Sequence, residues 1–341
     1  MAARAGVSPG AVSFALNNRP GVAPATRRRI LDVATDLGWQ PSLRARSLSR
    51  STSFTLGLVI ARSATSIGAD PFFPAFVAGM NTMLAPRERS LLFTVVPDTD
   101  AEIATYRRLA AEQRVDGVIL TDLLAGDPRP RLVADLGLPA VTLGRPDDAG
   151  AHPQVGSVSV DDIGGVREVM STLIAQGHRR IAHVTGPRRY LHVRHRRDAW
   201  ASALQEADLP SARCVHTDFS AGQGAGATRR LLSTTRNQPT AIVYTNDVMA
   251  IAGLAELQRR GRSVPDDVSI TGFDDTDLAH HVQPPLTSVR TDVAGWGERA
   301  ATALLRAAAG EPPQHIELAP ARMVARASVA APPETSKGSQ P

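Results

Sequence analysis

Arginine side chains gather at the start of this sequence and define the first chemistry that it offers. Residues 1–50 contain eight arginines against two acids, Asp32 and Asp36, which gives this segment a net charge of +6. The full chain of 341 residues carries +5, so the remaining residues sum to −1. Guanidinium groups bind phosphate oxygens, and a basic segment on a nearly neutral body is typical of proteins that bind nucleic acid. A basic leader without a fold of its own is the alternative.

The residue types of an enzyme form only weak patterns in this chain. Residues 222–227 satisfy a loose G-x-G-x-x-A dinucleotide pattern, but residues 215–217 make a poor strand before it, which favours a glycine-rich loop that opens a helix. The sequence has no G-x-S-x-G elbow, His280 and His281 lack partners at metal-ligand spacing, and Cys214 has no evident base. We therefore expect no enzymatic activity, no cofactor and no metal.

Composition excludes several classes of protein. The chain has 43% hydrophobic and 21% charged residues, as ordinary globular proteins do, and its length fits two or three domains. Its single cysteine, Cys214, excludes an intrachain disulfide and indicates a reducing compartment. The sequence contains no run of about 18 apolar residues, so we expect a cytoplasmic protein without a signal peptide or a membrane span.

The basic segment carries the pattern of short helices. Ser8 followed by Pro9 is typical of a helix start, because a hydroxyl caps the first turn and proline fits the first helical position. A second helix begins near Pro24, repeats apolar residues at helical spacing and closes at Gly38. Residues 2–6 look like the last turn of a preceding helix. The segment therefore predicts a helix-turn-helix.

The body of the chain, from residue 54 to about residue 328, alternates short apolar runs with longer amphipathic stretches. The apolar runs predict strands at residues 56–60, 91–96, 115–120, 139–143, 181–184, 240–244 and 268–271. Strands that are buried on both faces and separated by helical patterns indicate parallel sheets flanked by helices. The number of these units predicts two doubly wound subdomains with a ligand-binding cleft between them.

Motifs along the whole chain resemble those of the lactose-repressor (LacI/GalR) family, in the same order. The first group consists of Ala5-Gly6-Val7-Ser8, Ala11-Val12-Ser13-Phe14-Ala15-Leu16-Asn17 and Leu37-Gly38-Trp39-Gln40-Pro41. The body adds Asp70-Pro71-Phe72-Phe73, Gly177-His178-Arg179-Arg180-Ile181, Asn246-Asp247, Gly272-Phe273-Asp274-Asp275 and Arg326-Ala327-Ser328. Each motif alone is weak, but their ordered succession over more than 300 residues is specific.

The resemblance implies how the chain is divided. An all-α helix-turn-helix head with a truncated first helix would occupy residues 1–39, and a hinge helix or linker residues 40–53. An α/β core like that of periplasmic binding proteins, with two interleaved doubly wound parallel-sheet subdomains, would occupy residues 54–330. We expect a disordered tail at residues 331–341. Met1 falls in the middle of the family's first helix, so we expect translation to begin upstream, and a weakened head is the alternative.

The resemblance also implies DNA contacts in the head. The helix that begins at Ser8 would lie in the major groove, and the matching positions are Ser8, Pro9, Gly10, Ser13, Phe14 and Asn17. Pro9, Gly10 and Phe14 match base-facing positions, while the hydroxyl and amide side chains match positions that hold phosphates. Phe14 makes no bidentate hydrogen bond to a base, so we expect it to contact thymine methyl groups. A place in the core of the head is the alternative for Phe14.

The hinge carries a second set of implied DNA contacts, at Arg44, Ala45 and Leu48. Leu48 would be the apolar wedge that enters a minor-groove base step and kinks the duplex. Arg44 would add attraction for phosphates. A plain flexible linker is the alternative for this segment.

The positions that match the family's ligand pocket are Phe72, Phe73, Asp161, Arg196, Phe219, Asn246 and Asp274. Aromatic rings cover the faces of a ligand, a guanidinium donates to hydroxyls, and carboxylates accept from them. This mixture suits a sugar, although a nucleobase would also fit. Capping of the next helix is the alternative role for Asp161 and Asp274, since each follows an apolar run.

These observations predict a transcriptional repressor that binds semi-palindromic operator DNA as a homodimer. A small-molecule effector, a carbohydrate by the chemistry of the pocket, would shift the population between arrangements of the subdomains. The C-terminal residues show no leucine heptads, which favours a dimer over a tetramer. The alternative is a cytoplasmic sugar-binding module that does not bind DNA because its head is truncated.

Overall fold

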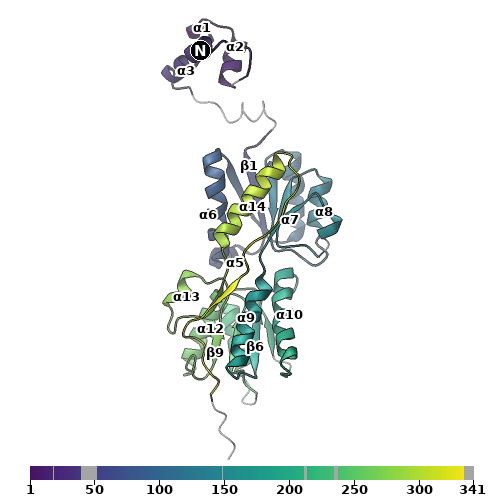
Figure 1. Cartoon of the computed structure of the whole chain (residues 1–341), viewed down its shortest axis with the longest axis vertical. Helices are drawn as coiled ribbons and strands as arrows, with labels where there is room; N and C mark the ends of the chain where they lie inside the picture. Colours follow the sequence, from purple (N-terminus) through teal and green to yellow (C-terminus); the bar gives the residue numbers. More distant parts are fainter. Residues whose placement is uncertain (18, 40–51, 148, 211–212, 234–236, 334–341) are drawn as a thin grey trace, which may run out of the picture.

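A small helical head lies at one end of the molecule, and two α/β bodies follow below it (Figure 1). The computed structural model describes residues 1–17, 19–39, 52–147, 149–210, 213–233 and 237–333. The predicted hinge contacts Arg44, Ala45 and Leu48 lie outside the described residues, as does most of the predicted tail.

The head consists of helices α1 (Ala2–Ala5), α2 (Pro9–Leu16) and α3 (Pro24–Asp36). Ser8 caps α2, because its hydroxyl accepts a hydrogen bond from the amide of Ala11 at 3.2 Å. Pro9 stands at the first helical position, and Gly38 follows α3 with a φ of +60°. Both helix boundaries therefore have the causes that the sequence predicts. Side chains from all of these helices form the centre of the head, with Ala5, Ala15 and Ile30 fully buried.

The upper body in Figure 1, here called the N-subdomain, is built on a six-stranded parallel sheet in the order β11-β5-β4-β3-β1-β2. Its strands are β1 (Thr55–Ala61), β2 (Ser90–Val96), β3 (Gly117–Leu120), β4 (Ala140–Leu143), β5 (Gly156–Ser159) and β11 (His315–Glu317). Its helices are α5 (Ala64–Ala69), α6 (Phe72–Leu84), α7 (Thr99–Ala111), α8 (Arg129–Asp135) and α14 (Val293–Ala308). Helices α6 and α14 cover one face of the sheet, and α7 and α8 cover the other.

The lower body, the C-subdomain, is built on a four-stranded parallel sheet in the order β7-β6-β8-β9. Its strands are β6 (Ile181–Thr185), β7 (Cys214–His216), β8 (Ala241–Tyr244) and β9 (Ser269–Thr271). Its helices are α9 (Asp162–Ala175), α10 (Leu191–Glu206), α11 (Ala221–Leu231), α12 (Asp247–Arg259) and α13 (Asp277–His281). Helices α9 and α10 pack on one face, and α11 and α12 on the other. An antiparallel pair, β10 (Ser288–Arg290) and β12 (Arg322–Val324), lies beside α9.

The two subdomains are interleaved along the chain, as the sequence predicts. The chain passes from one to the other between β5 and α9, between β10 and α14, and between β11 and β12. The loops that follow the strands of both sheets consequently meet between the subdomains. In doubly wound folds the carboxyl ends of parallel strands are where ligands bind.

Some predicted elements differ from the structure. Strand β2 was expected to be buried on both faces, but it is the edge strand of its sheet, with Phe93 40% and Val95 37% exposed. The pattern at residues 222–227 predicts a glycine-rich loop that opens a helix. A helix does begin there, α11 with the N-cap Ser220, but the glycines lie inside the helix and not in a loop before it. Gly224 instead provides close packing, because a Cβ there would lie 2.7 Å from the Cα of Met249. The sequence does not predict strands β5, β7, β10, β11 and β12.

Two glycines allow α6 and α14 to approach to backbone contact. A Cβ atom at Gly79 would lie 1.9 Å from the carbonyl oxygen of Ala294, and one at Gly297 would lie 2.2 Å from that of Phe76. The obstacle in both cases is backbone within a helix, which has no rotamer to change. A side chain at either position therefore requires the two helices to separate.

Replacing Gly79 with alanine should lower the free energy of unfolding by about 1–3 kcal/mol, the usual effect of overpacking a core. Gly226→Ala in α11 is the matched control, because nothing lies within 4 Å of a Cβ there. That variant should gain about 0.5–1 kcal/mol, since alanine favours a helix over glycine. Urea unfolding followed by circular dichroism measures both changes. A Gly79→Ala protein as stable as the parent would show that the helices are not in backbone contact.

Candidate functional site

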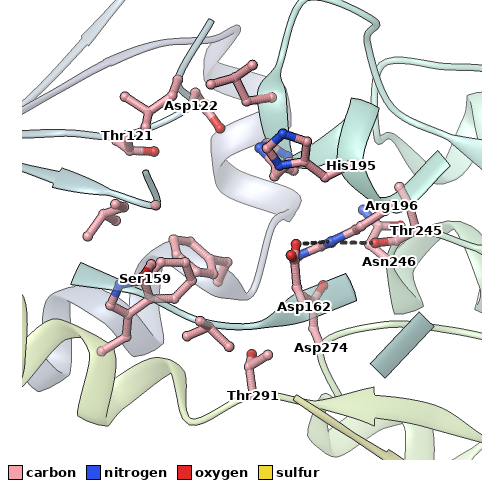
Figure 2. A pocket seen from close by; sticks show the side chains of 18 of the residues that line it. Thr121, Asp122, Ser159, Asp162, His195, Arg196, Thr245, Asn246, Asp274 and Thr291 are labelled. Carbon is pink, nitrogen blue, oxygen red and sulfur yellow. Dashed lines mark hydrogen bonds and ion pairs between the residues drawn. The ribbon is translucent and has the colours of Figure 1, made fainter. Parts of the chain in front are cut away.

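A cavity of about 310 Å³ lies between the two subdomains, where the loops after the strands of both sheets meet (Figure 2). Every side chain that the sequence placed in a ligand pocket lines this cavity, namely Phe72, Phe73, Asp161, Arg196, Phe219, Asn246 and Asp274. The structure thus brings together residues from the start of α6, from α10 and from the loops after β5, β7, β8 and β9. Their contacts with a ligand stay a prediction.

Arg196 on α10 is held in a fixed orientation at the wall of the cavity. Its Nε donates to Oδ2 of Asp162 at 2.7 Å, and its Nη1 donates to the carbonyl oxygen of Thr245 at 3.3 Å (Figure 2). Its guanidinium carbon lies 3.6 Å from the centre of the Phe273 ring. Sequence reasoning missed Asp162, whose only signal was its position next to Asp161. The guanidinium is therefore oriented before any ligand arrives.

Asp274 differs from Arg196 because its carboxyl group has no partner. Among the described residues no side chain or backbone amide forms a hydrogen bond with it. Burial, together with the charges of Asp247 and Asp70, raises its pKa well above the ordinary value. The alternative that Asp274 caps a helix is wrong, because α13 begins at Asp277 after the N-cap Thr276. A buried carboxyl at a cavity wall is free to bind a polar group.

Two other predicted residues have structural tasks as well. Asp161 is the N-cap of α9, and its Oδ1 accepts from the amide of Gly164 at 2.9 Å, so the capping alternative is correct for this residue. Asn246 caps α12 through its Oδ1, which accepts from the amide of Met249 at 2.9 Å. Its Nδ2 donates to the carbonyl oxygen of Phe219 at 3.2 Å. The amide of Asn246 thus ties α12 to the loop that carries an aromatic wall of the cavity.

A second arginine lines the cavity from the N-subdomain, and sequence reasoning missed it. Arg62 follows β1, and its Nε and Nη2 each donate to an oxygen of Asp122 at 2.6 Å. Its Nη1 donates to Oδ2 of Asp70 at 2.9 Å. The guanidinium carbon lies 5.2 Å from the ring centre of Phe73 and 4.8 Å from that of Phe219. Arg62 therefore contacts both subdomains, since Phe219 belongs to the C-subdomain.

Aromatic rings form two walls of the cavity. In the C-subdomain the rings of Tyr190, His192 and Phe219 form a cluster of nearly parallel rings, with centroid distances of 5.7 Å from Tyr190 to His192, 6.0 Å from His192 to Phe219 and 6.2 Å from Tyr190 to Phe219. In the N-subdomain the ring of Phe72 meets Trp296 edge to face at 5.8 Å. Burial and the nearby charge of Arg196 lower the pKa of His192 to about 4, so this imidazole is neutral at pH 7. No motif in the sequence pointed to His192 or Trp296.

The predicted DNA contacts within the described part of the head form one exposed surface. Ser8, Pro9, Gly10, Ser13, Phe14 and Asn17 are all solvent-exposed. Phe14 is 42% exposed, so its alternative place in the core of the head is wrong. The amide of Asn17 donates to the carbonyl oxygen of Ser13 at 3.0 Å, which holds it along the end of α2. Contact of this surface with DNA stays a prediction.

Cys214 and the candidate metal ligands are the other reactive groups in the described part of the chain. The Sγ of Cys214 lies 3.9 Å from Nε2 of His216, but burial raises the pKa of the thiol, which disfavours the reactive thiolate. The described residues include no group of three or more His, Cys, Asp or Glu side chains able to hold a metal ion. Within the same residues, every helix is too short or too polar to cross a lipid bilayer.

Comparison with known proteins gives matches for both ends of the chain. The family model described as bacterial regulatory proteins, lacI family, matches residues 1–42, and that of the periplasmic binding protein-like domain matches residues 170–329. The HTH-type transcriptional regulator CelR of Thermobifida fusca is 34% identical over 323 residues, which cover 93% of this chain and 93% of CelR.

Solved structures match the head and the core together. A complex of the transcriptional regulator CelR with cellobiose matches with a TM-score of 0.74 and 31% identity, over 96% of this chain and 98% of that one. The lac repressor dimer bound to operator and the anti-inducer ONPF matches with a TM-score of 0.82 and 26% identity, over 97% and 98%. The order of motifs, the interleaved subdomains and these matches agree. The chain belongs to the LacI family of bacterial regulatory proteins and is a DNA-binding transcriptional regulator.

Proposed function

We propose that this regulator is a repressor that binds semi-palindromic operator DNA as a homodimer, and that a carbohydrate in the cavity sets its affinity for DNA. One observation carries this proposal: the same cavity is lined by an oriented donor, Arg196, and by the Asp274 carboxyl, which has no partner among the described residues. Sugar hydroxyls both donate and accept, so they can satisfy both groups at once. The cavity is within the size range of small-molecule sites.

The walls of the cavity favour a sugar over a nucleobase. A pyranose ring has apolar faces made of C–H groups, which fit between the Phe72–Trp296 pair and the stack that contains Phe219. The neutral imidazole of His192 offers one hydrogen-bond donor and one acceptor at the edge of its ring. The relative CelR was solved in complex with cellobiose, which supports the same class of ligand here.

We assign DNA binding to a head at residues 1–39 and a hinge at residues 40–53, and ligand binding to a core at residues 54–330. Pro9, Gly10 and Phe14 would face the bases, and Ser8, Ser13 and Asn17 the phosphates. Arg44, Ala45 and Leu48 would contact DNA from the hinge. The lac repressor was solved as a dimer on its operator, which supports a dimer for this chain. Two heads related by a two-fold axis require two similar half-sites, which is why the operator is semi-palindromic.

We assign no reaction to the chain. The head supplies binding to DNA and the cavity supplies binding of a ligand, and neither task needs a chemical step. Co-purified nicotinamide cofactor, or its turnover with a carbonyl compound, would contradict this assignment.

A fluorescence-anisotropy titration tests the proposed function directly. The full chain should bind the DNA upstream of its own gene more tightly than random DNA of equal length, and the affinity should fall steeply with salt because phosphate contacts release counterions. One sugar from a panel of cellobiose, maltose and glucose should shift the dissociation constant. DNA binding that no sugar alters would contradict the proposed effector class, and sugar binding without DNA binding would indicate the sugar-binding module.

Phe14→Ala separates base contacts from phosphate contacts. This variant should bind operator more weakly by about 1–3 kcal/mol, the usual range for one base pair read in the groove. The slope of affinity against salt should not change, because phenylalanine neutralises no phosphate. Arg27→Ala is the matched control from the same head, and there the slope itself should fall. Equal loss on operator and on random DNA would show that Phe14 reads no base.

Asp274→Asn should weaken sugar binding and raise stability in the same protein. We expect about tenfold lower affinity for cellobiose, because a carboxyl that meets hydroxyls is lost, and about 1–2 kcal/mol higher free energy of unfolding, because a buried unpaired carboxyl is removed. The raised pKa means that the parent loses stability as the pH rises from about 3.9 through the folded-state pKa, and the variant should lack this slope. Isothermal calorimetry and urea unfolding at several pH values measure these effects.

Asp247→Asn is the control for this variant. Asp247 is also buried in the C-subdomain, but its carboxylate accepts from the hydroxyl of Ser288 at 2.6 Å and from the amide of Thr276 at 2.7 Å. Asp247→Asn should therefore lose about 1–3 kcal/mol of stability, because a satisfied acceptor is replaced. If both variants lose stability alike, Asp274 has a structural partner and is not free for a ligand.

A further inference from the structure

Asp122 holds an unusual backbone conformation at the wall of the cavity. It follows β3 and lines the cavity beside Thr121 (Figure 2). Its φ is +52°. Residues other than glycine adopt this left-handed region only rarely. Such a conformation persists where the surroundings determine it, and these places are often binding sites. A neighbouring group must therefore hold the backbone of Asp122 in this conformation.

Arg129, at the start of α8, supplies that hold. Its Nη2 donates to the carbonyl oxygen of Asp122 at 3.0 Å. The guanidinium is itself fixed, because its Nη2 donates to Oδ2 of Asp127 at 2.6 Å and its Nη1 donates to Oε1 of Glu102 at 2.7 Å. Glu102 is fixed in turn by the hydroxyl of Tyr106 at 2.7 Å. These side chains, apart from Asp122, are at most 3% exposed and none of them lines the large cavity.

The network is poorly explained by stability alone. Removing ions from water costs free energy that their mutual attraction only partly returns, so apolar side chains of equal volume often stabilise a core as well. Burial raises the pKa of Glu102 in spite of the neighbouring Arg129. The charged network holds a guanidinium at a defined place, with one donor directed at the Asp122 carbonyl. Apolar side chains would not supply that donor.

Asp122 in turn fixes the position of a cavity-lining side chain, Arg62. With its backbone left-handed, both oxygens of its carboxylate accept from Arg62 at 2.6 Å. Arg62 in turn lies over the ring of Phe219 in the opposite subdomain. The next residue, Leu123, accepts a backbone hydrogen bond across the cleft from the amide of Leu191 at 2.8 Å. The turn that Arg129 holds is therefore the part of the N-subdomain that meets the C-subdomain at the ligand site.

We propose that Arg129 is a positioning residue for the ligand cavity: it holds the backbone of Asp122, and Asp122 then places Arg62 at the cavity wall. Arg129 acts without contact with the ligand. Its effect on ligand affinity rests on the proposed function of the cavity, whereas its effect on Arg62 does not. The experiment therefore measures both the ligand affinity and the state of Arg62.

Arg129→Lys in the full-length protein is the principal test. Lysine keeps the buried positive charge but has all its donors on one nitrogen, so it lacks the planar fork by which Nε, Nη1 and Nη2 of Arg129 reach Asp127, Glu102 and the Asp122 carbonyl. In arginine-¹⁵N spectra, the Nε–H signal of Arg62, assigned by its absence in Arg62→Lys, should shift, and its hydrogen exchange should quicken by about tenfold or more as the ion pair loosens. Affinity for cellobiose by calorimetry should fall by about tenfold.

Arg89→Lys is the matched control. Arg89 also belongs to the N-subdomain and pairs with a carboxylate, Asp116, at 2.6 Å, but neither residue lines the cavity. This variant should lower the melting temperature and leave the Arg62 signal and the affinity for cellobiose unchanged. If Arg129→Lys leaves the Arg62 signal and exchange as in the parent, or if Arg89→Lys alters them equally, Arg129 has no positioning role.

Glu102→Gln covers the case in which Arg129→Lys does not fold. It weakens one side of the clamp on Arg129 and leaves Asp122, Arg62 and all cavity-lining residues in place. The same change in the Arg62 signal is expected, and an unchanged signal would overturn the proposal. If the parent protein binds none of cellobiose, maltose and glucose, the proposed function fails, and the Arg62 signal alone still decides the role of Arg129.

Discussion

The burial of the Arg62 guanidinium in the cleft is the interaction on which the rest of the site depends. A buried cation is tolerated only when carboxylates and hydrogen bonds replace its water. Burial lowers the pKa of Arg62, but the charge and hydrogen bonds of Asp122, with a contribution from Asp70, raise it above its ordinary value. The carboxylate of Asp122 follows β3 and that of Asp70 precedes α6, so the ion pairs of Arg62 hold the ends of these two elements together. Phe73 and Phe219 then pack over the guanidinium.

The cavity contains polar groups of two kinds, and the difference explains how it can bind selectively. Arg62, Arg196 and Asn246 already have protein partners, so their geometry costs a ligand no reorganisation. Asp274 and His192 have none among the described residues, and their hydrogen-bonding capacity is unsatisfied until something enters. A ligand that meets these groups gains a bond for each, whereas an apolar molecule of the same size leaves them buried and unpaired. This arrangement supports the proposed polyhydroxylated ligand.

Sequence predicted the parts of this structure that depend on local pattern. The central strands are nearly continuous apolar runs, and Ser8-Pro9 is a local helix signal, so the sequence predicts both. Strands such as β7 and β12 have three residues each, too few to show a period, and their place is decided by pairing. The seven predicted cavity residues came from ordered motifs of a known family. The pairing of Arg62 with Asp122 joins residues 60 positions apart through the topology of the sheet, which no local pattern records.

A ligand changes the affinity for DNA only as far as it binds one arrangement of the subdomains better than another. Differential affinity requires contacts that exist in one arrangement alone, and those must cross the cleft. Arg62 makes contacts that cross the cleft, because it is bound to Asp122 in one subdomain and lies against Phe219 and Tyr190 in the other. A sugar that touches Phe219 therefore acts on a group whose position also reports the separation of the subdomains. In the proposed function, a change in that separation reaches the DNA-binding end through the N-subdomain, to which the head is joined.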